Sequence, residues 1–97
     1  MQYKVVYSSA AQADLIELER YIAGRGSPRS AASYVEAIVA RCEELALSPY
    51  QGTRRDDLPG LRTTGFRRRV TIAFRVTPGT ILIAGIFYGG RRVRISR

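Results

Sequence analysis

The sequence predicts a small α+β domain of the order β-α-α-β-β-β, in which a helical hairpin packs on a mainly antiparallel sheet. The chain has 97 residues, of which 45% are hydrophobic, and this length and composition are typical of one globular domain. Apolar residues recur at helical spacing through residues 10–46, whereas after Gly60 the apolar period changes to two. We therefore expect one domain over residues 1–97, with a basic C-terminal segment at residues 89–97.

Residues 2–7 are rich in β-branched and aromatic side chains, which predicts a first strand. Residues 9–12 match a capping box, so the first helix is expected to begin at Ser9 and to end at Gly24. Ser27 and Pro28 predict the start of a second helix, because serine caps a helix and proline suits its first position. The short link between the two helices predicts an antiparallel hairpin.

The second half of the chain predicts strands. Residues 49–60 have the composition of a surface connection, and residues 61–64 are expected to form a short strand beside residues 69–76. Apolar and polar side chains alternate through residues 69–76, and a turn is predicted at residues 77–80. Residues 81–87 form an uninterrupted apolar run, which is typical of an interior strand covered on both faces. The helices can cover one face, and a partner is expected to cover part of the other.

The charge is strongly one-sided. All eight carboxylates lie at or before Asp57, whereas residues 58–97 contain nine arginines and no acid, in a chain with a net charge of +8. Arginine accounts for fifteen of the sixteen cations, and its planar guanidinium forms paired hydrogen bonds to carboxylates and phosphates. This pattern predicts an anionic partner: nucleic acid, an acidic protein or an anionic membrane surface.

Several functions are disfavoured by the residue types present. The chain has no histidine, the usual general acid or base near neutral pH, and its single cysteine, Cys42, lies on the apolar stripe of a predicted helix. Asp56 and Asp57 are interpreted as a solvated turn pair. We expect no metal and no cofactor. No apolar stretch is long enough to span a membrane, and no signal peptide is evident, so we expect a cytoplasmic protein.

Two arginine-rich segments are candidate contact sites. Residues 67–69 are expected to open a strand, so that their side chains alternate between faces; a solvated strand end is the alternative. Residues 88–94 combine a tyrosine, two glycines and three arginines, and indicate either a solvated tail or a contact segment for an anionic surface. Phe74 and Phe87 are expected in the core, which disfavours a plain nucleic-acid-binding module based on base stacking.

The order and spacing of short motifs resemble the ParE toxins of the RelE/ParE superfamily, from bacterial type II toxin–antitoxin modules. The resemblance covers about residues 3–92. It rests on residues 3–7, Asp14 with Leu15, residues 21–23, Ser27 with Pro28, Tyr34, Ser48 with Pro49, residues 60–62, residues 74–76 and residues 86–91.

The resemblance implies a toxin that inhibits DNA gyrase and replication, stabilises a plasmid or chromosome, and is neutralised in a hetero-oligomeric complex with an acidic antitoxin. A non-enzymatic toxin is favoured. The expected target-binding residues are Tyr88, Arg91, Arg92 and Arg94, and the expected antitoxin-binding residues are Arg62, Arg68, Arg69 and Arg75. The alternative is a RelE-like, ribosome-dependent mRNA endoribonuclease with Arg62, Arg75 and Tyr88 as catalytic residues. Tyr88 and Arg92 stand where ParE-like sequences commonly have histidine and aspartate.

Overall fold

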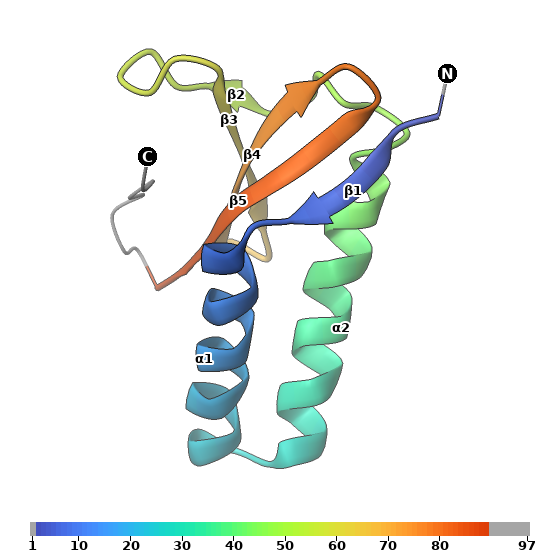
Figure 1. The fold of residues 1–97 in the computed structure, drawn as a ribbon. Helices are drawn as coiled ribbons and strands as arrows, with labels where there is room; N and C mark the ends of the chain where they lie inside the picture. The colour runs from blue at the N-terminus through green and yellow to red at the C-terminus, as the bar shows by residue number, and fades with distance from the viewer. Residues whose placement is uncertain (1, 90–97) are drawn as a thin grey trace.

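A computed structural model describes residues 2–89 and has the predicted α+β architecture (Figure 1). Its five-stranded sheet has the order β1-β5-β4-β3-β2, in which only the β1–β5 pair is parallel. The short strand β2 was not predicted, because it lies in the expected surface connection. The elements are β1 (Lys4–Tyr7), α1 (Ser9–Arg25), α2 (Pro28–Glu44), β2 (Thr53–Arg54), β3 (Leu61–Phe66), β4 (Val70–Thr77) and β5 (Thr80–Tyr88).

The first helix is capped by Ser8, one residue before the predicted cap. The Ser8 hydroxyl oxygen accepts from the Ala11 N–H at 3.0 Å, and Gln12 Nε2 donates to the Tyr7 carbonyl instead of closing a capping box. The helix continues past Gly24 to Arg25, where the Gly26 N–H donates to the Ile22 carbonyl. The predicted end at Gly24 was therefore wrong, because the following glycine, Gly26, provides the cap.

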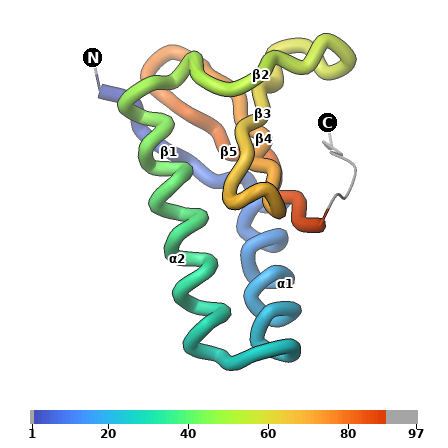
Figure 2. The backbone as a smooth tube through the Cα atoms, turned by 180° about the vertical axis from the view of Figure 1, so that it is seen from behind, coloured from blue at the N-terminus to red at the C-terminus, as the bar shows by residue number. Residues whose placement is uncertain are grey.

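The second helix begins at Pro28 with Ser27 as its cap, as predicted. It lies antiparallel to α1, and the two helices cover one face of the sheet (Figures 1 and 2). Its buried residues are Ala31, Ile38 and Cys42, followed by Leu45 just beyond its end. Cys42, which was predicted to lie on the apolar stripe of this helix, is therefore buried.

A bulge in β5 explains why its apolar run does not alternate. Ala73 pairs with Gly85 but Phe74 pairs with Ile83, which leaves Ala84 as an extra residue. The bulge shifts the alternation, so Ile81 and Ile83 before it and Ile86 and Tyr88 after it all face the helices. The core joins these isoleucines to Val70, Ile72 and Phe74 of β4 and to the buried helix residues.

The opposite face of the sheet is partly apolar, and no helix covers it among the described residues, although Leu61 and Ala73 are buried on it. Val6 is 37% exposed there, next to the half-buried Leu82 in the β1–β5 pair. Phe87 lies on this face as well, not in the helix-side core as predicted. Its ring covers Gly85, where an added Cβ would lie 2.7 Å from Phe87 Cζ. The expectation that the helices cover only one face is confirmed.

The β3–β4 connection contains an unusual turn. Arg67 and Arg68 have φ values of 50° and 62°, and the Arg69 N–H donates to the Phe66 carbonyl at 3.2 Å. Positive φ at both central positions is typical of a type I′ turn, which favours asparagine and glycine. The prediction that these arginines open a strand was wrong. We call residues 66–69 the arginine turn.

Side-chain stacking offsets part of the strain in the arginine turn. The Arg67 guanidinium carbon lies 4.8 Å from the centre of the Phe66 ring and 5.7 Å from that of Tyr34. Left-handed backbone costs a non-glycine residue roughly 1 kcal/mol at each position, whereas an exposed cation–π contact contributes about 0.5–1 kcal/mol. The turn is therefore expected to be a net cost to folding.

We predict that R67N/R68G raises the free energy of unfolding by about 1 kcal/mol, because asparagine and glycine suit the backbone of this turn. In a domain of this size that gain corresponds to a melting temperature about 4–8 °C higher. Thermal and denaturant unfolding measure it. A less stable variant would mean that the Arg67 stacking outweighs the backbone strain.

Candidate functional site

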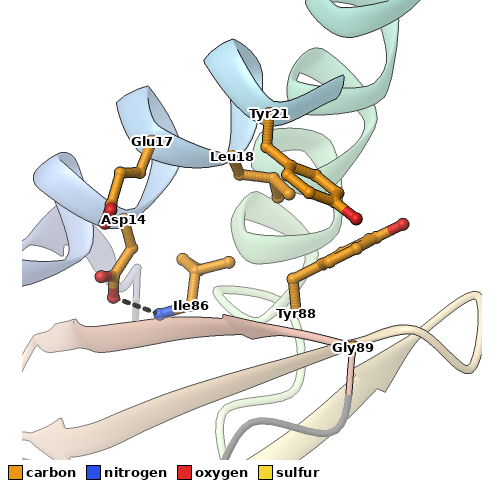
Figure 3. A pocket seen from close by; sticks show the side chains of 7 residues that line it. All are labelled: Asp14, Glu17, Leu18, Tyr21, Ile86, Tyr88 and Gly89. Carbon is orange, nitrogen blue, oxygen red and sulfur yellow. Dashed lines mark hydrogen bonds between the residues drawn. The ribbon is translucent and has the colours of Figure 1, made fainter. Parts of the chain in front are cut away.

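A pocket of about 320 Å³ lies between α1 and the end of β5 (Figure 3). It exists because β1 pairs with β5 only as far as Tyr7 and Ile83, so that α1 lies beside the rest of β5. The lining residues are Asp14, Glu17, Leu18 and Tyr21 from α1 and Ile86, Tyr88 and Gly89 from the end of the sheet.

Side chains at the start of α1 form hydrogen bonds with the backbone groups at this edge of β5. Asp14 Oδ2 accepts from the Ile86 N–H at 2.9 Å, and the Ser8 hydroxyl donates to the Ala84 carbonyl at 3.1 Å. These bonds replace the ladder that β1 would have provided. They explain why the Asp14 carboxylate points into this pocket: it holds the helix on the strand. Asp14 was named above only among the motifs of the family resemblance, and its bond to the strand was not predicted.

We predict that Asp14→Ala lowers the free energy of unfolding by about 1–3 kcal/mol, because it leaves a part-buried backbone N–H without its acceptor. Glu17→Ala is the matched control: Glu17 lines the same pocket but is exposed and has no hydrogen bond or ion pair within residues 2–89. Its change is expected to stay within about 0.5 kcal/mol. Equal losses in the two variants would contradict the structural role of Asp14.

Aromatic side chains continue from the pocket toward the arginine turn. We call Tyr21, Tyr34, Phe66 and Tyr88 the aromatic cluster. The Tyr88 ring lies 5.6 Å from that of Tyr21 and 6.4 Å from that of Tyr34, which in turn meets Phe66 edge-on at 5.5 Å. The hydroxyl of Tyr34 is buried without a hydrogen-bond partner in the described part of the chain, and this burial raises the pKa of Tyr34. Tyr88 thus belongs to a packed cluster.

A second pocket, of about 340 Å³, is rich in arginine. Arg54, Arg55 and Arg62 line it together with Tyr50, the exposed Asp56, Val76 and the 59–61 segment. Arg62 Nη1 donates to the Tyr50 carbonyl at 3.0 Å, and its guanidinium lies 5.3 Å from the centre of the Tyr50 ring. Arg54 lies directly opposite Arg62 across the β2–β3 pair. Like charges at directly opposed positions destabilise a sheet, so this pocket favours an anion.

Asp57 neutralises only one arginine of this pocket. Arg55 donates two hydrogen bonds to the Asp57 carboxylate, at 2.9 and 2.8 Å, and these bonds lower the pKa of Asp57. The interpretation of Asp57 as an exposed turn carboxylate is confirmed. Sequence analysis missed Arg54 and Arg55, because β2 has two residues and no periodicity that predicts its pairing with β3.

The predicted site residues do not form one site. Arg62 extends toward Tyr50, whereas Arg75 lies on the sheet face away from the helices and donates to the Pro59 carbonyl at 2.8 Å. Tyr88 pairs with Val70, at the other end of β4 from Arg75. The residues of the RelE-like alternative are therefore spread over the sheet.

The proposed binding residues are also divided. Of the four arginines predicted to bind an antitoxin, Arg68 and Arg69 lie at the arginine turn, far along the sheet from Arg62 and Arg75. The predicted target-binding arginines, Arg91, Arg92 and Arg94, lie outside the described residues.

Cys42 is confirmed as a core residue. It is 0% exposed, and burial raises the pKa of its thiol to about 11. Next to it, the Tyr7 hydroxyl donates to Glu43 Oε2 at 3.0 Å, and burial is the main reason why the pKa of Tyr7 is raised. Residues 2–89 contain no group of three histidine, cysteine, aspartate or glutamate residues arranged to hold a metal. Within the same range, no helix is long and apolar enough to cross a membrane.

We predict that iodoacetamide modifies Cys42 in the folded protein at pH 8 at least about 100-fold more slowly than in the unfolded chain. A pKa raised by about two units lowers the thiolate fraction by roughly that factor, and burial slows access further. Mass spectrometry with and without denaturant measures the ratio. Equal rates would mean that Cys42 is accessible in the native state.

The comparisons with known proteins place this fold in a family. Residues 5–93 match the sequence profile of the ParE toxin of type II toxin–antitoxin systems, parDE. The chain therefore belongs to the ParE toxin family, and is a ParE-type toxin of a toxin–antitoxin system. The comparison with curated protein sequences gives no significant match.

Two solved structures share the fold. The chromosomal ParDE toxin–antitoxin system from P. aeruginosa matches with a TM-score of 0.81 and 24% identity, over 91% of this chain and 97% of that chain. The toxin–antitoxin complex RelBE2 from Mycobacterium tuberculosis matches with a TM-score of 0.60 and 20% identity, over 91% of this chain and 99% of that chain.

Proposed function

We propose that this ParE-type toxin acts in the cytoplasm by inhibiting DNA gyrase and that a cognate acidic antitoxin neutralises it. The observation that carries the proposal is the family match over nearly the whole chain. The two structural matches come from toxin–antitoxin systems, which supports an antitoxin partner. The one-sided charge supports an acidic one, since residues 58–97 contain no carboxylate.

The sheet face away from the helices is the proposed antitoxin surface. It offers the exposed Val6 and the half-buried Leu82 and Phe87, with Arg75 on the same face. An amphipathic antitoxin segment would bury its apolar side chains against this face and pair its carboxylates with Arg75 and, at the edge, Arg62. The pocket between Arg54 and Arg62 supports this assignment, because an anion there would relieve the repulsion of two opposed guanidinium groups.

Gyrase contact is assigned to the opposite end of the sheet, where Tyr88 precedes the basic segment that contains Arg91, Arg92 and Arg94. The geometry disfavours ribonuclease activity. The chain has no histidine, and Arg62, Arg75 and Tyr88 lie on different faces and ends of the sheet. To act on one phosphate of an RNA substrate, these three side chains would all have to lie within hydrogen-bond reach of that phosphate.

We predict that the toxin, separated from its antitoxin and refolded, inhibits DNA supercoiling by purified gyrase. An equimolar amount of antitoxin is expected to restore supercoiling. A gel-based supercoiling assay measures both. The control is mRNA bound to ribosomes, which should stay intact at the same toxin concentration. Unimpaired supercoiling together with cleaved mRNA would overturn the proposal and establish the RelE-like alternative.

A further inference from the structure

The arginine turn is not explained by the stability of the fold. Both of its central residues have left-handed backbone, at φ values of 50° and 62°, although arginine is poorly suited to that conformation. By contrast, the β4–β5 turn places a glycine, Gly79, at its positive φ of 73°. Strain that persists at one turn while the neighbouring turn avoids it is typical of a functional element.

The guanidinium groups of this turn are available to a ligand. Arg67, Arg68 and Arg69 are all exposed. The ion pairs within residues 2–89 are Arg41 with Glu44 and Arg55 with Asp57, so the turn has no carboxylate partner there. Stacking on Phe66 and Tyr34 fixes the direction of the Arg67 side chain, so less side-chain entropy is lost when it binds.

The turn is also bonded to the end of β5. The Gly89 N–H donates to the Arg69 carbonyl at 2.8 Å, so the chain leaves the sheet beside the turn. The next eight residues contain four arginines and no acid. The three arginines of the turn therefore lie beside Gly89, the last described residue.

We propose that the arginine turn binds the phosphate backbone of duplex DNA, without sequence preference. The three arginines supply charge at adjacent positions, and phosphates along DNA are evenly spaced anions that arginine contacts well. An acidic peptide would need apolar anchors beside the charges. At the turn, however, the Arg67 guanidinium covers the rings of Phe66 and Tyr34. The other exposed large apolar residues are Val6, Ile16, Leu47 and Tyr50, which lie in β1, in α1 and in the segment between α2 and β2. Tyr21 of the aromatic cluster is exposed as well, and the Arg25 guanidinium carbon lies 4.8 Å from the centre of its ring.

DNA binding is measured without gyrase, so this inference is independent of the proposed gyrase inhibition. The probe is a fluorescent 20-base-pair duplex, titrated with the refolded full-length toxin at several salt concentrations between 50 and 200 mM. The variant is R67N/R68G, which is expected to be more stable than the parent, so loss of binding cannot result from unfolding. The matched control is R20Q/R29Q, which removes two exposed helix arginines and the same net charge.

R67N/R68G is expected to weaken DNA binding about tenfold or more and to reduce the slope of log K against log salt by about two, because two phosphate contacts are lost. R20Q/R29Q should change both quantities much less. Equal losses in the two variants would overturn the inference, because net charge alone would then explain binding. Unchanged DNA binding with weakened antitoxin binding would also overturn it, because the turn would then contact an acidic protein.

Gyrase inhibition measured with the same variants separates the two proposals. A toxin that binds DNA through the turn but leaves gyrase active would contradict only the proposed function. A toxin that inhibits gyrase equally well with and without the turn arginines, and binds DNA equally well, would contradict only the DNA-binding inference.

Discussion

The bulge at Ala84 is the constraint on which the arrangement of this toxin depends. Without it, residues 85 and 87 would face the helices, and a glycine would take a core position that Ile86 now fills. The shift directs Tyr88 toward the aromatic cluster and Phe87 toward the opposite face. One extra residue thus determines both the end of the core and the composition of the surface that we assign to the antitoxin.

The same strand creates a second requirement. Because β1 ends opposite Ile83, the remaining edge of β5 needs other hydrogen-bond partners, and Ser8 and Asp14 provide them. Ser8 both caps α1 and bonds to β5, so the start of the helix and its position on the sheet are fixed by one side chain. The pocket beside Tyr88 forms because α1, and not β1, lies beside the last residues of β5.

The sequence was sufficient for the order of all the elements except the two-residue strand β2, because the change from helical to alternating periodicity is local information. It was insufficient wherever the outcome depends on pairing. Ser8 and Ser9 are equally good caps locally, and the bond of Ser8 to Ala84 distinguishes them. The bulge and the two-residue strand β2 leave no periodic pattern, and two arginines in left-handed conformation contradict the usual preference of turns for glycine and asparagine.

The candidate site was predicted less completely than the fold. Charge composition indicated arginine as the candidate functional residue type. Strand alternation alone could not show that Arg62 and Arg75 lie on opposite faces, or that Arg54 opposes Arg62. These relations depend on register, which tertiary packing determines. The arginines therefore divide into a pocket at the β2 edge and a strained turn at the far end of the same sheet.

This division bears on the two partners that we propose for this chain. A toxin that is neutralised by an antitoxin and that also contacts a target needs two surfaces whose binding free energies can change independently. Such surfaces must lie far apart or differ in chemistry. The open sheet face combines apolar area with arginine, as a protein interface requires, whereas the arginine turn presents charge over rings that are already covered. Two exposed guanidinium groups held in an unfavourable backbone conformation contribute nothing to folding that asparagine and glycine would not supply better. This expected cost to folding is the reason why we propose a contact outside the chain for them.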